Sequence, residues 1–250
     1  MARFSPAWML LIFSLGYGVL FCSQASAGVV IGGTRFVYGE KQHGLMVSVR
    51  NKSDNTYLIN ARTETGGDWA GSDIPVTKRS PFIVTPPLFA LKPDGEYTLR
   101  IIQAGGELAE NKESLFTLDI ASIPSGKAEP NSVQIAVRTR LKLFYRPADL
   151  KGNPQQAYTQ LQWHREGGDI VINNPSPYYV TLFQLSVNGV PIDNAGMVPP
   201  LGSRKVNWCH GSGACQLRWQ TINDYGRIMP AVTLNVDSSN PVSVISTEHK

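Results

Sequence analysis

Apolar and polar residues alternate with a period of two through much of the chain, and this alternation restricts the fold more than any other feature. Residues at every second position line one face of a strand, whereas a helix repeats every 3.6 residues. Such runs occupy residues 45–49, 97–102 and 114–120. Another run, residues 180–187, leads into Asn188-Gly189, the strongest short signal for a β-hairpin. The pattern predicts many short strands, and no stretch of ten residues or more reads as a convincing helix.

Composition and length point to two sandwich domains. Only 17% of the 250 residues are charged, while the chain has 23 glycines and 17 prolines, which favours strands and turns. The length allows one large domain or two modest ones. A natural boundary follows Arg146, where Pro147 and the polar stretch 151–154 would end a strand. We therefore predict an all-β protein with sandwiches at residues 28–146 and 154–250, joined by a linker at 147–153.

The first 27 residues have the features of a secretory signal peptide. Arg3 supplies the positive start, residues 8–21 form an almost unbroken apolar run, and Ala25-Ser26-Ala27 fits the small-x-small cleavage rule. The apolar run, at about 14 residues, is shorter than the roughly 20 that a membrane-spanning helix needs. Cleavage would leave a mature protein that begins at Gly28. We expect export of a soluble protein.

Loss of this segment leaves two cysteines, Cys209 and Cys215. In an oxidising compartment, this spacing favours one disulfide across a hairpin or short loop. A zinc site is the sharper alternative because His210 adjoins Cys209. However, a structural zinc site needs four ligands in close pairs, and the chain offers no second pair. We predict the disulfide and no metal site.

Charge and motifs disfavour several classes of function. The net charge of +4 is small and spread along the chain, so it gives poor evidence for nucleic-acid binding. The sequence has no GxSxG, HExxH or P-loop motif, and its four histidines form no paired spacing. We therefore expect no enzyme activity, catalytic residue, cofactor or small-molecule substrate. A secreted carbohydrate-binding β-sandwich is the alternative, because Trp163, Trp208 and Trp219 lie in the second domain, and it requires exposed tryptophans.

The longest alternating run covers residues 133–145. Fully extended, it would span about 43 Å, more than twice the usual length of a strand. Two interpretations stay open from the pattern alone. The run is either a core strand with one face buried, or its first half is an exposed edge that can pair with another chain.

Residues 139–147, with the sequence TRLKLFYRP, resemble the signature of the periplasmic chaperones of the chaperone–usher pilus pathway, the PapD-like family. Four further segments match this family in the same order: Gly33-Thr34-Arg35, Thr85-Pro86-Pro87, Glu113-Ser114-Leu115-Phe116 and Asn223-Asp224-Tyr225-Gly226. The resemblance covers nearly all of the mature chain. It implies two immunoglobulin-like β-sandwich domains arranged as an L with a cleft between them.

The resemblance also implies a binding site for pilus subunits. Arg35 and Lys142 match two cations that grip the C-terminal carboxylate of a subunit, although each alone would read as a solvated surface charge. Val133, Ile135 and Val137 match positions that lend side chains to a subunit lacking its last strand. Lys142 has the opposite parity to these three residues, so we expect a twist or bulge between them.

Other matches concern the domain interface and the loops. Glu113, Arg146 and Asp224 match a charged trio that orients the two sandwiches. Pro86 matches a proline that follows a cis peptide bond. The short segment at residues 125–131 resembles the short-loop class of these chaperones.

The function implied by the resemblance is that of a periplasmic chaperone. Such a protein binds, folds and caps pilus (fimbrial) subunits by donor-strand complementation and delivers them to the outer-membrane usher. An unpaired apolar edge also favours self-association of the free chaperone.

Overall fold

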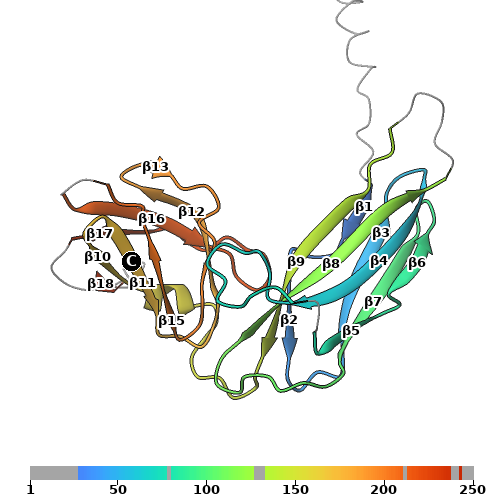
Figure 1. Ribbon diagram of the computed structural model, residues 1–250, viewed down its shortest axis with the longest axis horizontal. Coiled ribbons are helices and arrows are strands. Elements are labelled where there is room, and N and C mark those ends of the chain that lie inside the picture. Colours follow the sequence, from blue (N-terminus) through green and yellow to red (C-terminus); the bar gives the residue numbers. More distant parts are fainter. Residues whose placement is uncertain (1–27, 78–79, 127–132, 211–212, 238–241, 244–250) are drawn as a thin grey trace, which may run out of the picture.

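The computed structural model describes residues 28–77, 80–126, 133–210, 213–237 and 242–243. The predicted signal peptide and most of the predicted short loop, residues 127–131, lie outside the described residues. Two β-sandwiches meet at one end and diverge into an L (Figure 1), which confirms the predicted fold class. Within the described part, no helix has both the length and the apolar character needed to cross a membrane.

The first sandwich packs two sheets face to face. One sheet has the order β1-β3-β7-β5 and the other the order β2-β9-β8-β4-β6. The strands are β1 (Val29–Ile31), β2 (Arg35–Gly39), β3 (Leu45–Asn51), β4 (Thr56–Thr65), β5 (Phe82–Thr85), β6 (Leu88–Leu91), β7 (Glu96–Gln103), β8 (Ser114–Ser125) and β9 (Val137–Arg146). Alternation builds the core as predicted, since Val47 and Val49 are buried in it while Met46 and Arg50 are exposed.

The second sandwich has its own core. Its sheets have the orders β15-β11-β10-β18 and β13-β12-β16-β17. The elements are η2 (Ala157–Gln160), β10 (Gln162–Glu166), β11 (Asp169–Asn174), β12 (Val180–Val187), β13 (Val190–Pro191), β14 (Met197–Val198), β15 (Gly202–Val206), β16 (Cys215–Thr221), β17 (Val232–Val236) and β18 (Val242–Ser243). Asn188 and Gly189 both have positive φ, at 50° and 79°, so the predicted hairpin is confirmed as a tight β12–β13 turn.

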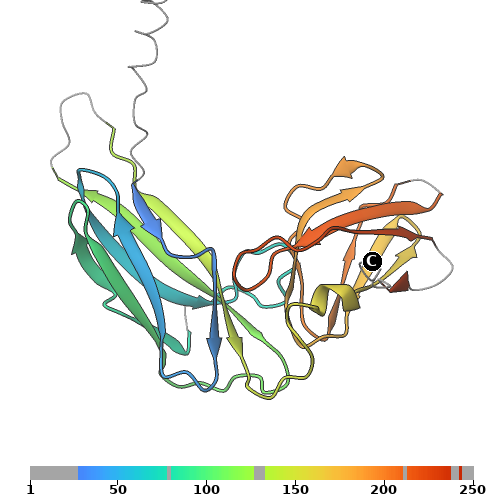
Figure 2. The same ribbon diagram turned by 180° about the vertical axis from the view of Figure 1, so that it is seen from behind.

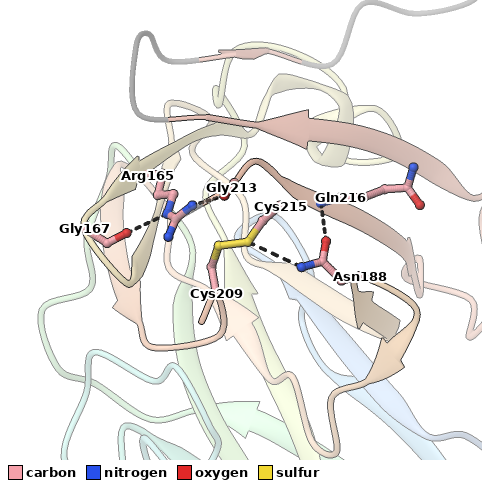
Figure 3. Close-up of a disulfide and its surroundings, with 7 residues drawn as sticks. All are labelled: Arg165, Gly167, Asn188, Cys209, Gly213, Cys215 and Gln216. Carbon is pink, nitrogen blue, oxygen red and sulfur yellow. Dashed lines mark hydrogen bonds between the residues drawn. A yellow bond between two sulfur atoms is a disulfide. The ribbon is translucent and has the colours of Figure 1, made fainter. Parts of the chain in front are cut away.

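The predicted disulfide joins Cys209 to Cys215, and both cysteines are buried in the second core. Figure 3 shows how neighbouring side chains tie this region together. The Arg165 guanidinium donates hydrogen bonds to the backbone carbonyls of Gly167 and Gly213, and the side-chain Oδ1 of Asn188 accepts the backbone N–H of Gln216 at 2.8 Å. The disulfide therefore links the segment before β16 to the start of that strand.

The first strand of the chain changes sheets after three residues. β1 pairs antiparallel with β3, and after Gly32-Gly33 the chain enters β2, which pairs parallel with β9. β2 covers β9 only from Lys142 to Arg146. Among the described strands, none pairs with the same edge of β9 between Val137 and Leu141. This part of β9 lies on the side of the first sandwich that faces the opening of the L (Figures 1 and 2).

The predicted strand at residues 133–145 is shorter in the structure, where β9 begins only at Val137. The pairing of β8 with β9 ends at Ser122 and Val137, so the residues before Val137 have no described neighbour that would hold them in a ladder. Of the expected twist or bulge, a bulge is absent from the described part of this strand, because the register against β8 is continuous from Val137 to Tyr145.

Candidate functional site

Arg35 and Lys142 are direct neighbours on the parallel strands β2 and β9. Their adjacent residues, Phe36 and Leu143, enter the core of the first sandwich. Alternation therefore directs the two cations to the opposite face of the sheet, toward the second sandwich. The Arg35 Nη1 atom donates a 2.8 Å hydrogen bond to the carbonyl of Ile222 in the second sandwich.

The two cations line a cleft of about 770 Å³ between the sandwiches. The opposite wall comes from β12, from the segment that follows the β12–β13 hairpin, and from Arg218 and Ile222. β12 bulges at this wall, since its pairing with β16 shifts register between Phe183 and Ser186, and Gln184 has a φ of 47°. The cleft is thus formed by both domains.

Burial removes both cations from much of their hydration. Burial, together with the neighbouring Arg35 charge, lowers the pKa of Lys142 to about 8. Burial also lowers the pKa of Arg35, against the opposing effect of Asp224 and Glu113. Within the described residues, neither cation lies within ion-pairing distance of a carboxylate, and the buried Arg35 Nε has no hydrogen-bond partner. Two desolvated cations without an anion form a site suited to a carboxylate.

Val133, Ile135 and Val137 are strongly exposed, at 86%, 69% and 53% of their maximal accessible surface. The first two precede β9, and the third is its first residue. Because the register of β9 is continuous, Val137 and Lys142 lie on opposite faces of one regular strand. A single regular strand can thus present Lys142 on the cleft face and Val137 on the other face without a bulge between them.

The structure brings Glu113, Arg146 and Asp224 together between the domains. Arg146 donates from Nε to Glu113 at 2.7 Å and from Nη1 and Nη2 to the two Asp224 oxygens at 2.8 and 3.0 Å. The N–H of Tyr179 donates to the other Glu113 oxygen at 2.8 Å. Burial raises the pKa of Glu113 to about 7 although Arg146 favours its charged form. For Arg146, burial acts to lower the pKa, but Asp224 and Glu113 outweigh it and the net direction is upward.

An apolar cluster supports this ion network. Leu115 and Phe144 of the first sandwich are buried against Met197 of the second. The Phe144 and Tyr179 rings pack with their centroids 5.5 Å apart. The interface thus combines apolar packing with a hydrogen-bonded charged trio, which fits a fixed rather than a loose arrangement of the two domains.

One residue near the site escaped the sequence analysis. Trp69 lies in the loop after β4, and the Nζ atom of Lys142 is 4.9 Å from the centroid of its ring. Its signal in the sequence is an isolated aromatic residue in the polar, glycine-rich stretch TGGDWAGSD.

The tryptophans of the second sandwich do not form an exposed aromatic surface. Trp163 and Trp219 are fully buried and pack with ring centroids 4.7 Å apart. Trp208 is half-buried, with the Arg204 guanidinium 5.2 Å from its ring centroid. These three side chains do not meet the requirement of the carbohydrate-binding alternative.

Comparison with known families and curated proteins identifies relatives along most of the chain. Residues 28–151 match the family described as pili and flagellar-assembly chaperone, PapD N-terminal domain. Residues 156–233 match the pili assembly chaperone PapD, C-terminal domain. The uncharacterized fimbrial chaperone YcbF of Escherichia coli K12 is 41% identical over 218 residues, which are 87% of this chain and 92% of the relative. The chaperone protein FimC of the same strain is 38% identical over 221 residues, 86% of this chain and 87% of FimC.

Solved structures agree with these relatives. The YadV chaperone superposes with a TM-score of 0.70 at 30% identity, covering 84% of this chain and all of the other. The SafB chaperone of Salmonella enterica, solved in complex with the SafA pilin, superposes with a TM-score of 0.72 at 28% identity, covering 84% of this chain and 96% of the matched chain. The two family matches together cover both sandwiches, and each of these relatives and solved structures matches the chain across both. The chain therefore belongs to the PapD family of pilus-assembly chaperones.

Proposed function

We propose that this protein is a periplasmic chaperone that binds, folds and caps pilus subunits by donor-strand complementation and delivers them to an outer-membrane usher. Its role is non-enzymatic, and residues 1–27 direct its export and are then cleaved. The observation that carries this proposal is the pair Arg35 and Lys142, two partly desolvated cations beside an uncovered strand edge, with no carboxylate partner among the described residues. The subunit's C-terminal carboxylate supplies the missing anion.

The position of β2 defines how a subunit strand would lie. β2 begins at Arg35 and runs parallel to β9. A peptide whose carboxylate contacts Arg35 and Lys142 ends where β2 begins, and its preceding residues extend along the uncovered edge toward Val137. That peptide runs in the same direction as β9, so the two strands pair in parallel.

The exposed residues before and at the start of β9 supply the remaining contacts. Residues 133–136, which have no strand partner here, extend β9 when the subunit strand pairs with them. Val133, Ile135 and Val137 then enter the incomplete apolar groove of the subunit. Backbone hydrogen bonds provide affinity, and the alternate side chains provide specificity. In support, the SafB relative was solved in complex with a pilin.

The two domains act together in this proposal. Residues 28–146 provide the strand and the cations, residues 147–153 form the linker, and residues 154–250 provide the other wall of the cleft. Glu113, Arg146 and Asp224 hold the angle at which that wall faces Arg35 and Lys142. When no subunit is bound, the same exposed edge favours self-association.

Co-purification from the periplasm tests the proposal. The protein is expressed together with its native operon and isolated, and bound chains are identified by mass spectrometry. The double variant Arg35→Ala/Lys142→Ala is compared with Arg50→Ala/Lys41→Ala, a matched control that removes two exposed cations outside the cleft. We expect the wild type and the control to carry one small subunit per chaperone, and the cleft variant to lose it.

Ile135→Asp tests the donor strand separately, because it places a charge where an apolar side chain should enter the subunit. We expect this variant to fold as the wild type does and to lose the subunit. If the wild type carries no subunit, the proposed function is wrong. If the cleft variant retains as much subunit as the control, the carboxylate site is wrongly assigned.

A further inference from the structure

The loop at residues 66–76, hereafter the bridging loop, spans from the first sandwich to the second. Its ends are joined by two backbone hydrogen bonds between Thr65 and Thr77, at 3.0 and 3.1 Å. In Figure 1 it is the teal loop between the two sandwiches, and Figure 2 shows it in the same place from behind. The Ala70 carbonyl accepts a 2.8 Å hydrogen bond from the N–H of Met197 in the second sandwich. The loop is thus a defined structural link between the domains.

Further contacts fix the part of the loop around Trp69. Asp68 forms an ion pair with Arg140 at 3.3 Å. The Trp69 Nε1 atom donates a 3.1 Å hydrogen bond to the Thr117 hydroxyl, which in turn donates to the Gly66 carbonyl at 2.7 Å. The Trp69 ring is therefore held in one orientation by β8 and by its own loop.

Gly67 makes this orientation sterically possible. A Cβ atom at this position would collide with the Trp69 ring nitrogen and with the Thr117 hydroxyl. The loop has to pass close to both groups, and only glycine leaves the space.

At its far end, the loop also contacts the second sandwich through a side chain. The Tyr179 hydroxyl donates a 2.6 Å hydrogen bond to Asp73. Burial raises the pKa of Tyr179, and this bond and the Asp73 charge raise it further, so the hydroxyl keeps its proton as a donor. Trp69 is thus flanked in the loop by contacts with both domains.

We propose that Trp69 is a positioning residue of the subunit-binding site, holding the Lys142 ammonium in place through its ring face while the bridging loop ties that ring to both domains. The proposal deepens the proposed function and rests on it. It concerns how the cation is held, since Trp69 does not line the cleft and is not expected to touch the subunit.

The physical basis is the attraction between an ammonium and an aromatic face. The Nζ of Lys142 lies 4.9 Å from the ring centroid, within the roughly 6 Å range of cation–π contacts. A lysine ammonium sits on a flexible four-carbon chain and lacks the planar shape that orients an arginine guanidinium. In a cleft where burial and Arg35 both disfavour the charge, an aromatic face stabilises the cation without neutralising it, whereas a carboxylate would compete with the ligand. The ammonium thus stays charged and available to the subunit's carboxylate.

A spectroscopic test reads the position of Lys142 directly in the full protein without a subunit. Lysines are converted to ¹³C-dimethyl-lysine, which keeps the positive charge, and the Lys142 signal is assigned by its loss in Lys142→Met. We expect an upfield ring-current shift of this signal, abolished in Trp69→Leu and retained in Trp69→Phe. The pKa of Lys142 should fall in Trp69→Leu, because apolar burial persists while the ring attraction is lost. Trp208→Leu, which removes another tryptophan under a cation, should change neither property.

A second measurement uses subunit capture by the same variants in the co-purification assay. We expect at least about a threefold lower yield of complex for Trp69→Leu, with Trp69→Phe and Trp208→Leu close to the wild type. If Arg35→Ala/Lys142→Ala loses the subunit but Trp69→Leu captures it as well as the wild type does, the positioning role is overturned and the proposed function stands. No capture by the wild type would overturn the proposed function, and an unshifted Lys142 signal would overturn the positioning role on its own.

Discussion

Replacing Lys142 with methionine should stabilise the subunit-free protein, although it removes a cation of the proposed binding site. The ammonium is partly buried, and both burial and Arg35 lower its pKa to about 8 from the ordinary 10.5. A lysine whose pKa is lower in the folded state carries a free-energy cost below that pKa, because the unfolded chain holds the proton more tightly. Methionine keeps most of the apolar length of lysine without the charge.

The pKa of Lys142 sets the size and the pH range of this effect. At about 1.36 kcal/mol for each unit by which the pKa falls from 10.5 to about 8, the charged form costs roughly 3 kcal/mol at pH 7. As the pH rises from 8 to 10.5, the folded protein has lost the proton while the unfolded chain still binds it, so the stability of the wild type increases. At pH 10 the advantage of Lys142→Met should therefore shrink to about 1 kcal/mol or less.

Urea unfolding at pH 7 and pH 10, followed by circular dichroism, measures the difference between the two proteins. At pH 7 the midpoint of the transition that includes the first sandwich should rise by roughly 1 M for Lys142→Met. Lys41→Met, at an exposed lysine outside the cleft, is the matched control and should stay within about 0.5 kcal/mol of the wild type. The proposed cost of the buried charge is refuted if the urea midpoint of Lys142→Met at pH 7 is unchanged or lower. It is also refuted if the gain in stability is as large at pH 10 as at pH 7, because the buried charge of Lys142 would then not be its cause.

Three other perturbations address the framework around the cleft. Arg146→Ala should destabilise the protein by about 3 kcal/mol in denaturant unfolding, because it leaves Glu113 buried without its cation. Asp224→Asn should destabilise it less, because the Asp224 side chain is one-quarter exposed. Cys209→Ala/Cys215→Ala should cost about 2 kcal/mol, the loop-closure entropy of a short loop, and a thermal midpoint equal to that of the wild type would contradict this. Gly196→Ala should cost about 1–3 kcal/mol and widen the angle between the domains, because a Cβ there collides with the Ala70 carbonyl at a φ of 78°. Small-angle X-ray scattering measures that angle, with Gly189→Ala, in open space on the hairpin, as the control for strain alone.

Local patterns in the sequence were sufficient to predict much of the fold. The alternation in residues 45–49 and the Asn188-Gly189 turn each depend on neighbours along the chain, and the structure has a strand and a hairpin there. The cysteine pairing was likewise predictable, since the two residues are only six apart. These features are determined by short-range geometry and solvent exposure.

Features set by contacts between distant segments were not predictable in the same way. The start of β9 at Val137 depends on where β8 stops pairing, which the alternation of residues 133–145 does not encode. Arg35 and Lys142 are 107 positions apart in the numbering, and their contact depends on a strand that changes sheets, so only family resemblance pointed to the pair. The contact of Trp69 could not be predicted from its neighbours along the chain, because the cation above its ring is Lys142, which lies on the distant strand β9.

The start of β2 at Arg35 closes one end of the open edge of β9. A backbone ladder alone allows a strand to slip by two residues, because a two-residue step returns each side chain to the same face. In the proposed complex, β2 already fills the edge beyond Lys142, and a slip in the other direction withdraws the carboxylate from both cations. The register of a bound subunit is therefore set by where its chain ends. A subunit with residues added after its natural C-terminus has no room for them beside β2, so affinity tags for such subunits belong elsewhere in their chains.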